Sequence, residues 1–202
     1  MKKTKDKKMT LYKKMPKKDY ILYSAIILIG VILDQITKII VLSLDWSSSG
    51  EVSLIDGLLS FKFITNSGAL GGMLSDSDER WIFMVISTIA IIGFGLYIFL
   101  GHSDTKLIGI SMALVTSGGI GNMIDRTFLG EVTDFIRFPF LHYPSFSGGN
   151  FHWADFPIFN IADCFVTVGA FMLIFALILA LIEEIKKSKR EKAEKSEKGG
   201  KK

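Results

Sequence analysis

Ionisable and amide side chains occur inside stretches of this chain that are otherwise apolar. They are Asp34, Lys38, Asn122, Asp125, Arg126, Asn160 and Asp163. A charged group inside a membrane-spanning segment is energetically expensive, so its presence there indicates a functional site. These residues are therefore the first candidates for chemistry.

Asp134 and Asp163 lie on either side of the connection between two apolar stretches, so we expect both near the same edge of the membrane. Asp134 lies five residues beyond the end of one apolar stretch, and Asp163 lies three residues into the next. Two neighbouring carboxylates share one proton, which leaves one as a general base and the other as a general acid. Such a pair can activate water against an amide. Spacing alone leaves open the alternative that one aspartate caps a helix while the other pairs with Arg126 or Arg137.

A metal site is a second kind of chemistry to consider. His142, His152 and Asp155 could together suggest zinc. Two histidines and one carboxylate in a flexible loop give it little support, so we expect no metal and no cofactor. Cys164 is the only cysteine, which excludes an intramolecular disulfide and a multi-cysteine zinc site. We interpret it as a small residue that packs between helices.

Four apolar runs must position these groups. They are residues 20–44, 81–101, 107–129 and 160–182, each 21 to 25 residues long. A bilayer core needs about 20 residues of helix, so all four can span a membrane. The first run is too long for a secretory signal and no small-residue cleavage site follows it, so we interpret it as a retained helix. The fold class is therefore an all-α membrane protein with four transmembrane helices.

Positive charges concentrate at the two ends of the chain. Of 24 Lys and Arg residues, eighteen lie in residues 1–19 and 183–202. Because cytoplasmic segments are enriched in Lys and Arg, we expect both termini in the cytoplasm and residues 45–80 and 130–159 outside. The candidate residues then all lie in the outer half of the membrane. Basic residues confined to tails also make no surface for nucleic acid.

The two outer segments carry patterns of their own. Residues 51–64 contain two β-prone runs around Asp56-Gly57, which predicts a hairpin in a small sheet. Residues 130–159 hold nine aromatic residues around Ser147-Gly-Gly-Asn150. We expect this segment to be a flexible aromatic loop at the membrane interface, acting either as an anchoring belt or as a lid.

At these residues the chain resembles the lipoprotein signal peptidases, also called type II signal peptidases. The matching segments are Asp34-Gln-Ile-Thr-Lys38, Asn66-Ser-Gly-Ala69, Gly119-Ile-Gly-Asn-Met-Ile-Asp-Arg126, Gly130-Glu-Val-Thr-Asp-Phe-Ile136 and Phe159-Asn-Ile-Ala-Asp163. Five motifs in the same order are far more specific than any one of them. Two departures are Leu70-Gly-Gly-Met73, where the family usually has an aromatic residue, and a long segment from 141 to 155.

The resemblance implies an aspartyl endopeptidase of the bacterial inner membrane. It implies cleavage of diacylglyceryl-modified prolipoproteins just before the lipidated cysteine, with these substrates and the membrane lipids as partners. It does not imply an oligomer. Asp134 and Asp163 become the catalytic pair. The supporting polar set is Asp34, Asn66, Asn122, Asp125, Arg126 and Asn160. The peptidase domain would be residues 20–182, between cytoplasmic tails at 1–19 and 183–202.

A small transporter or channel that uses intramembrane carboxylates for protons or cations is the alternative function. A conduction path distributes polar groups through the depth of the membrane. The candidate residues are instead expected only in the outer half, and the run 81–101 contains no charged residue. The distribution of polar groups therefore favours the peptidase.

The orientation can be tested by cysteine labelling at Lys8, Ser147 and Lys192. Because both tails are positively charged, we expect only the cysteine at position 147 to react with an impermeant reagent added from outside. Labelling of whole cells, with permeabilised cells as the control, measures this. Reaction at position 192 in intact cells would contradict the four-span arrangement.

Overall fold

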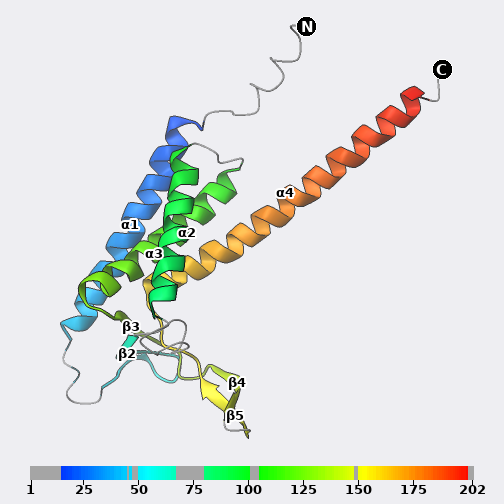
Figure 1. Ribbon diagram of the computed structural model, residues 1–202. Helices are drawn as coiled ribbons and strands as arrows, with labels where there is room; N and C mark the ends of the chain where they lie inside the picture. The colour runs from blue at the N-terminus through cyan, green and yellow to red at the C-terminus, as the bar shows by residue number, and fades with distance from the viewer. Residues whose placement is uncertain are drawn as a thin grey trace.

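The computed structural model describes residues 15–44, 46, 50–66, 80–100, 105–147 and 150–199, with side chains except at 80–83, 146, 147, 150 and 193–199. The elements in chain order are α1 (Lys17–Leu42), β1 (Val52–Ile55), β2 (Leu59–Asn66), α2 (Arg80–Phe99), α3 (Lys106–Phe128), β3 (Val132–Arg137), β4 (His142–Ser147), β5 (Asn150–Asp155) and α4 (Ile161–Gly199). All the strands gather at one end of the helices (Figure 1).

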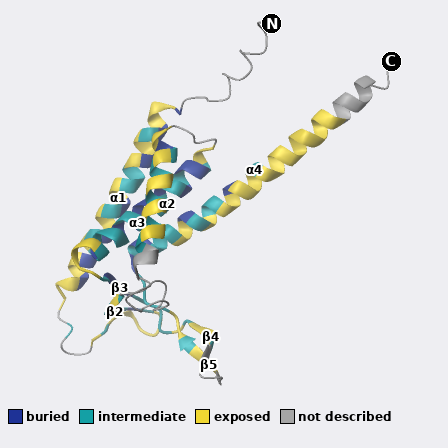
Figure 2. Cartoon of the chain, in the orientation of Figure 1, coloured by how far each residue is buried: buried dark blue, intermediate teal, exposed yellow. Residues whose placement is uncertain are grey.

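Three of the helices are long and apolar enough to cross a membrane. They are α1, α3 and the part of α4 from Ile161 to Lys192. The part of α2 with described side chains, Met84–Phe99, is apolar but shorter. Large apolar side chains point outward, and Ile21 and Phe171 are each 70% exposed. Exposed residues run along much of α1 and α4 (Figure 2), and many of those in α1 and in the first part of α4 are large and apolar. Such surfaces suit contact with lipid.

α3 lies at the centre of the helices and contacts α1, α2 and α4. Small residues allow these close approaches, as is usual in membranes. A Cβ atom at Gly118 would collide with the carbonyl oxygen of Ala162 in α4. A Cβ atom at Gly121 would lie 2.5 Å from Oδ2 of Asp34 in α1. The glycines of α3 therefore bring polar groups from three helices together.

The predicted hairpin is confirmed, and it belongs to a larger sheet. β1 and β2 are antiparallel around Asp56 and Gly57, and Gly57 has a φ of 69°, which glycine adopts readily. β3 then pairs with β2, so that Ile64 lies opposite Asp134. The order in the sheet is β1-β2-β3. The third strand was not predicted, because its pairing depends on a partner about seventy residues away.

The expected aromatic loop at 130–159 is wrong as a description of this segment. Its described residues form β3 and a second hairpin of β4 and β5, with Tyr143 opposite Ala154 and Pro144 opposite Trp153. In β5, Phe151 and Trp153 alternate with Asn150 and His152, and that alternation suits a strand better than a loop. The glycines expected at the tip, 148 and 149, lie outside the described residues.

The predicted helix boundaries agree with the structure within three residues, except at the end of α4. This helix does not stop near Ile182 but continues to Gly199, through most of the tail at residues 183–202. Glu and Lys dominate the extension, and both favour helix. Glu183 also precedes Lys187 by four residues, a spacing that stabilises helices. Of the other tail, predicted as residues 1–19, residues 1–14 lie outside the described part of the chain, and α1 begins within the rest at Lys17.

Candidate functional site

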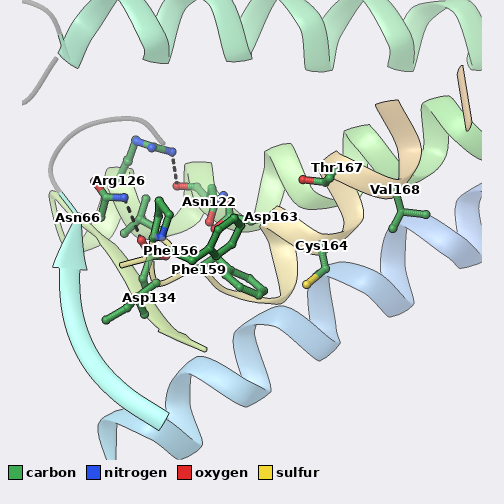
Figure 3. A pocket seen from close by; sticks show the side chains of 13 residues that line it. Asn66, Asn122, Arg126, Asp134, Phe156, Phe159, Asp163, Cys164, Thr167 and Val168 are labelled. Atoms are coloured by element: carbon green, nitrogen blue, oxygen red, sulfur yellow. Dashed lines mark hydrogen bonds between the residues drawn. The ribbon is translucent and has the colours of Figure 1, made fainter. Parts of the chain in front are cut away.

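A pocket of about 430 Å³ lies where α3 and α4 meet the sheet. The residues that line it are Asn66, Asn122, Arg126, Val132, Asp134, Phe156, Pro157, Ile158, Phe159, Asp163, Cys164, Thr167 and Val168. Its polar side chains converge from β2, β3, α3 and the start of α4 (Figure 3). The pocket continues along α4 toward Val168, which is 51% exposed on the apolar outer surface. One end is therefore polar and the other apolar.

Asp134 enters the pocket from β3, and its side chain is almost completely buried. A short connection with Gly130 at a φ of 82° leads from the end of α3 into this strand. The side-chain amide of Asn66 donates to Oδ2 of Asp134 at 2.9 Å. The amide of Asn160 donates to Oδ1 at 2.7 Å. Each oxygen of this carboxyl group thus accepts a hydrogen bond.

Asp163 enters the pocket from the first turn of α4. Its Oδ2 accepts a hydrogen bond from the backbone N–H of Asn160, and its own N–H donates to Oδ1 of Asn160, at 3.1 and 2.9 Å. This reciprocal arrangement caps the helix. The amide of Asn122 donates to Oδ1 of Asp163 at 2.8 Å. The helix cap considered as an alternative is therefore present, on a carboxylate that also lines the pocket.

Arg137 does not pair with either aspartate of the pocket. Its guanidinium binds Glu51 at 2.9 Å and Asp155 at 3.1 Å, and so joins the first sheet to the β4–β5 hairpin. Arg126, by contrast, lines the pocket and donates to the carbonyl oxygen of Asn122 at 3.4 Å. Its positive charge is attracted by the negative charges of Asp163 and Asp134. The alternative that one of these aspartates pairs with Arg137 is therefore wrong.

Burial changes the acidity of Asp134. Loss of water around the carboxyl group, followed by the negative charge of Asp163, raises the pKa of Asp134 to about 7, although Asn66 and Asn160 act in the other direction. A carboxyl group with this pKa holds its proton near neutral pH. It can therefore act as a proton donor where an ordinary aspartate would already be ionised.

Asp34, Lys38 and Asp125 form a buried ion cluster behind the pocket. Nζ of Lys38 lies 2.9 Å from Oδ2 of Asp34 and 2.9 Å from Oδ2 of Asp125. Lys38 therefore pairs with both aspartates. Asp125, which the resemblance placed in the supporting polar set, does not line the pocket, whereas Asn122 and Arg126 of the same helix do.

The ion cluster also holds the two segments that carry the aspartates of the pocket. Oδ1 of Asp34 accepts from the backbone N–H of Ala162 at 2.9 Å, next to Asp163. Oδ2 of Asp125 accepts from the N–H of Thr133 at 3.0 Å, next to Asp134. Asp34 and Asp125 therefore act on the pocket through the backbone of its neighbours.

Sequence reasoning missed several residues of this region. Gln35 donates to Asp34, Asp125 and the carbonyl oxygen of Gly121 at 3.1 to 3.2 Å. The sequence did contain a signal for Gln35, because it is an amide directly after Asp34 in an apolar run. The apolar lining from Phe156 to Phe159 had no such signal, because aromatic residues are frequent throughout that segment. Cys164, expected between helices, also lines the pocket.

The histidines considered for zinc lie in the second hairpin. Nε2 of His142 is 3.2 Å from Oδ1 of Asp155, an aspartate that also binds Arg137. Among the residues that the structure describes, no group of three or more His, Cys, Asp or Glu side chains could hold a metal ion.

The sequence comparisons identify the family. The family model described as Signal peptidase (SPase) II matches residues 26–179, well over half of the chain. The chain belongs to the signal peptidase II family. The type of enzyme that the sequence motifs implied is thereby confirmed, and this signal peptidase is a protease. Membership also removes the transporter alternative.

Relatives of this signal peptidase cover most of its length. The lipoprotein signal peptidase of Symbiobacterium thermophilum is 34% identical over 154 residues, which are 75% of this chain and 91% of that protein. The lipoprotein signal peptidase of Bacillus pumilus is 36% identical over 157 residues, 78% of this chain and 92% of that protein. A solved structure of a bacterial membrane enzyme is 30% identical, covers 83% of this chain and 97% of its own, and gives a TM-score of 0.64.

Asp34→Asn tests how much this signal peptidase depends on the ion cluster. Both oxygens of Asp34 accept hydrogen bonds, so an asparagine would turn an N–H group toward a donor and leave Lys38 with one carboxylate fewer. We expect the free energy of unfolding to fall by roughly 3 kcal/mol, as when a buried ion pair loses one partner. Thermal unfolding in detergent measures it. The control is Asp56→Asn in the exposed hairpin turn, and equal unfolding midpoints for the two variants would contradict the prediction.

Proposed function

We propose that this signal peptidase removes the signal peptide from diacylglyceryl-modified prolipoproteins, with Asp134 and Asp163 as its catalytic pair. The observation that carries the assignment is that β3 and α4 each bring one carboxyl group into a single pocket. The pKa of Asp134, raised to about 7 by burial and by the charge of Asp163, supports a pair that holds one proton at neutral pH.

The proposed reaction needs one ionised and one protonated carboxyl group. The ionised group takes a proton from a water molecule, whose oxygen attacks the carbonyl carbon of the scissile amide. The protonated group donates to the carbonyl oxygen, which gains negative charge as the tetrahedral intermediate forms. Transfer of a proton to the amide nitrogen then allows the C–N bond to break. Asn66, Asn122 and Asn160 keep the two carboxyl groups oriented throughout, because each donates to one of them.

The shape of the pocket supports a substrate that is part peptide and part lipid. Its polar end holds the two aspartates and Arg126, and its apolar end runs along α4 past Thr167 to Val168. The lipidated cysteine of a prolipoprotein keeps its acyl chains in the outer leaflet. An opening toward the bilayer therefore lets the scissile amide reach the carboxyl groups while the acyl chains stay in lipid.

The proposed arrangement in the membrane has four spanning helices. The fourth spanning helix is α2, beside α1, α3 and α4. Both ends of the chain lie in the cytoplasm, and the pocket lies near the outer face of the membrane. The start of α1 and the far end of α4 lie at the end of the molecule opposite the strands, which supports this orientation (Figure 1). The peptidase domain is then residues 20–182, with cytoplasmic tails on either side.

The β4–β5 hairpin is a candidate lid over the bound substrate. Phe151 and Trp153 lie edge to face, with ring centres 5.7 Å apart, and are 53% and 64% exposed. Side chains of this kind favour the membrane interface. Residues 67–73, which follow β2, lie outside the described part of the chain.

Asp134→Asn and Asp163→Asn test the catalytic pair on purified protein with a diacylglyceryl-modified prolipoprotein. We expect each variant to lower kcat by at least about 10³-fold, and the double variant to be scarcely worse, because groups that act as a unit are non-additive. Asp56→Asn controls for loss of an aspartate elsewhere. Near-normal cleavage by the Asp163→Asn variant would refute the pair. The unlipidated precursor, assayed alongside, shows whether the lipid is recognised.

The pH dependence of cleavage follows from the pKa of Asp134. This carboxyl group keeps its proton below a pH of about 7 and loses it above. We therefore expect kcat/KM to fall about tenfold per pH unit on the alkaline side of this value. Asn66 donates to Asp134 and lowers its pKa, so Asn66→Ala should move the alkaline limb to higher pH. A profile of the unmodified enzyme that stays flat to pH 9 would contradict the prediction.

A further inference from the structure

Lys38 is a buried cation that does not line the pocket. Its side chain is 3% exposed, and the pocket is lined by other residues. An ammonium group has three N–H donors and no acceptor. Nζ of Lys38 lies 2.9 Å from Asp34, 2.9 Å from Asp125 and 3.1 Å from Oδ1 of Asn122. Its three donors are therefore matched by three acceptors, and one of these belongs to the pocket.

The contact with Asn122 determines which way that amide faces. An asparagine side chain can present either its oxygen or its NH₂ group to a neighbour. Because Lys38 can only donate, the oxygen of Asn122 must face it. The NH₂ group of Asn122 then points at Asp163, to which it donates at 2.8 Å.

Asn160 reinforces the same orientation. Its NH₂ group donates to Oδ1 of Asn122 at 3.0 Å and to Oδ1 of Asp134 at 2.7 Å. Its own oxygen accepts from the backbone N–H of Asp163 at 2.9 Å. Donors and acceptors thus follow one direction, from Lys38 and Asn160 through Asn122 to Asp163. Two members of this chain of hydrogen bonds can only donate: the backbone N–H of Asp163, which orients Asn160, and Lys38, which contacts Asn122 directly.

Lys38 also contributes charge. The pair is Asp134 from β3 and Asp163 from α4. The other charged groups around it come from the two helices that pack there: Asp34 and Lys38 from α1, and Asp125 and Arg126 from α3. The positive charge of Lys38 lies behind the pocket and favours the ionised form of Asp134. Arg126 lies inside the pocket, where substrate would meet it.

We propose that Lys38 is a positioning residue of the cleavage reaction, which fixes Asn122 so that its amide holds Asp163 in the reactive orientation. The proposal rests on the catalytic roles proposed for Asp134 and Asp163. Lys38 touches neither substrate nor the reacting atoms, and it acts through Asn122. The simpler alternative is that Lys38 only neutralises Asp34 and Asp125 and so stabilises the fold.

Lys38→Met and Gln35→Ala separate these two roles. Both variants remove donors to Asp34 and Asp125, but only Lys38 contacts Asn122. We expect both to lower the unfolding midpoint in detergent. Lys38→Met should also lower kcat on the diacylglyceryl-modified prolipoprotein by about 10²-fold, the effect of a misplaced reacting group, with KM changed less than about threefold. Gln35→Ala should keep kcat within about twofold.

The pH profile gives a second measurement that a structural role would not change. Loss of the positive charge of Lys38 favours the neutral form of Asp134, so the alkaline limb of kcat/KM should move to higher pH. Gln35→Ala should leave it in place. If Lys38→Met does not fold, Lys38→Met combined with Asp34→Asn removes one of the two unpaired carboxylates and takes its place in the assay.

The route through Asn122 is tested by combining variants. Lys38→Met and Asn122→Ala act on the same hydrogen bond, so their effects on kcat should be non-additive. Gln35→Ala combined with Asn122→Ala should be additive. Additive effects in the first pair, or an unchanged kcat and pH profile in Lys38→Met, would overturn the proposal. Full activity of Asp134→Asn in the same assay would instead refute the catalytic pair, so the two failures are distinct.

Discussion

Asp34, Lys38 and Asp125 place two negative charges and one positive charge in the contact between α1 and α3. A buried charge without a partner costs several kcal/mol, so this contact tolerates little displacement of either helix. The same two aspartates hold the N–H groups of Ala162 and Thr133. The beginning of α4 and the strand β3 are thereby tied to one cluster. The cluster thereby also sets the positions of Asp163 and Asp134, because these are the residues that directly follow Ala162 and Thr133.

The glycines of α3 are what allow this cluster to form. Gly118 and Gly121 leave room for the backbone of Ala162 and the carboxylate of Asp34. Without a hydrophobic driving force between helices in lipid, close contact of this kind and buried hydrogen bonds provide much of the packing energy. The helices therefore approach most closely at the level where the polar groups lie, and stability and site geometry have the same origin.

Three asparagines surround the two aspartates of the pocket, and all donate to them through neutral N–H groups. Neutral donors orient a carboxyl group without pairing it with a full charge. Burial can then raise the pKa of Asp134 to about 7, which a close ion pair would oppose. The cations are kept at other positions, with Lys38 behind the amides and Arg126 at the pocket wall. This separation suits a pair of carboxyl groups that must exchange a proton.

The four helices, the hairpin at Asp56-Gly57, the polar residues of the site and the family could all be predicted from the sequence. Those signals are local: run length, turn chemistry and short motifs. The pairing of β3 with β2 could not be predicted, nor could the finding that Asp125 faces the ion cluster while Asn122 faces the pocket. Both depend on partners that are distant in the chain. Helical spacing groups residues on a face, but the neighbouring helices determine which acceptor each side chain meets.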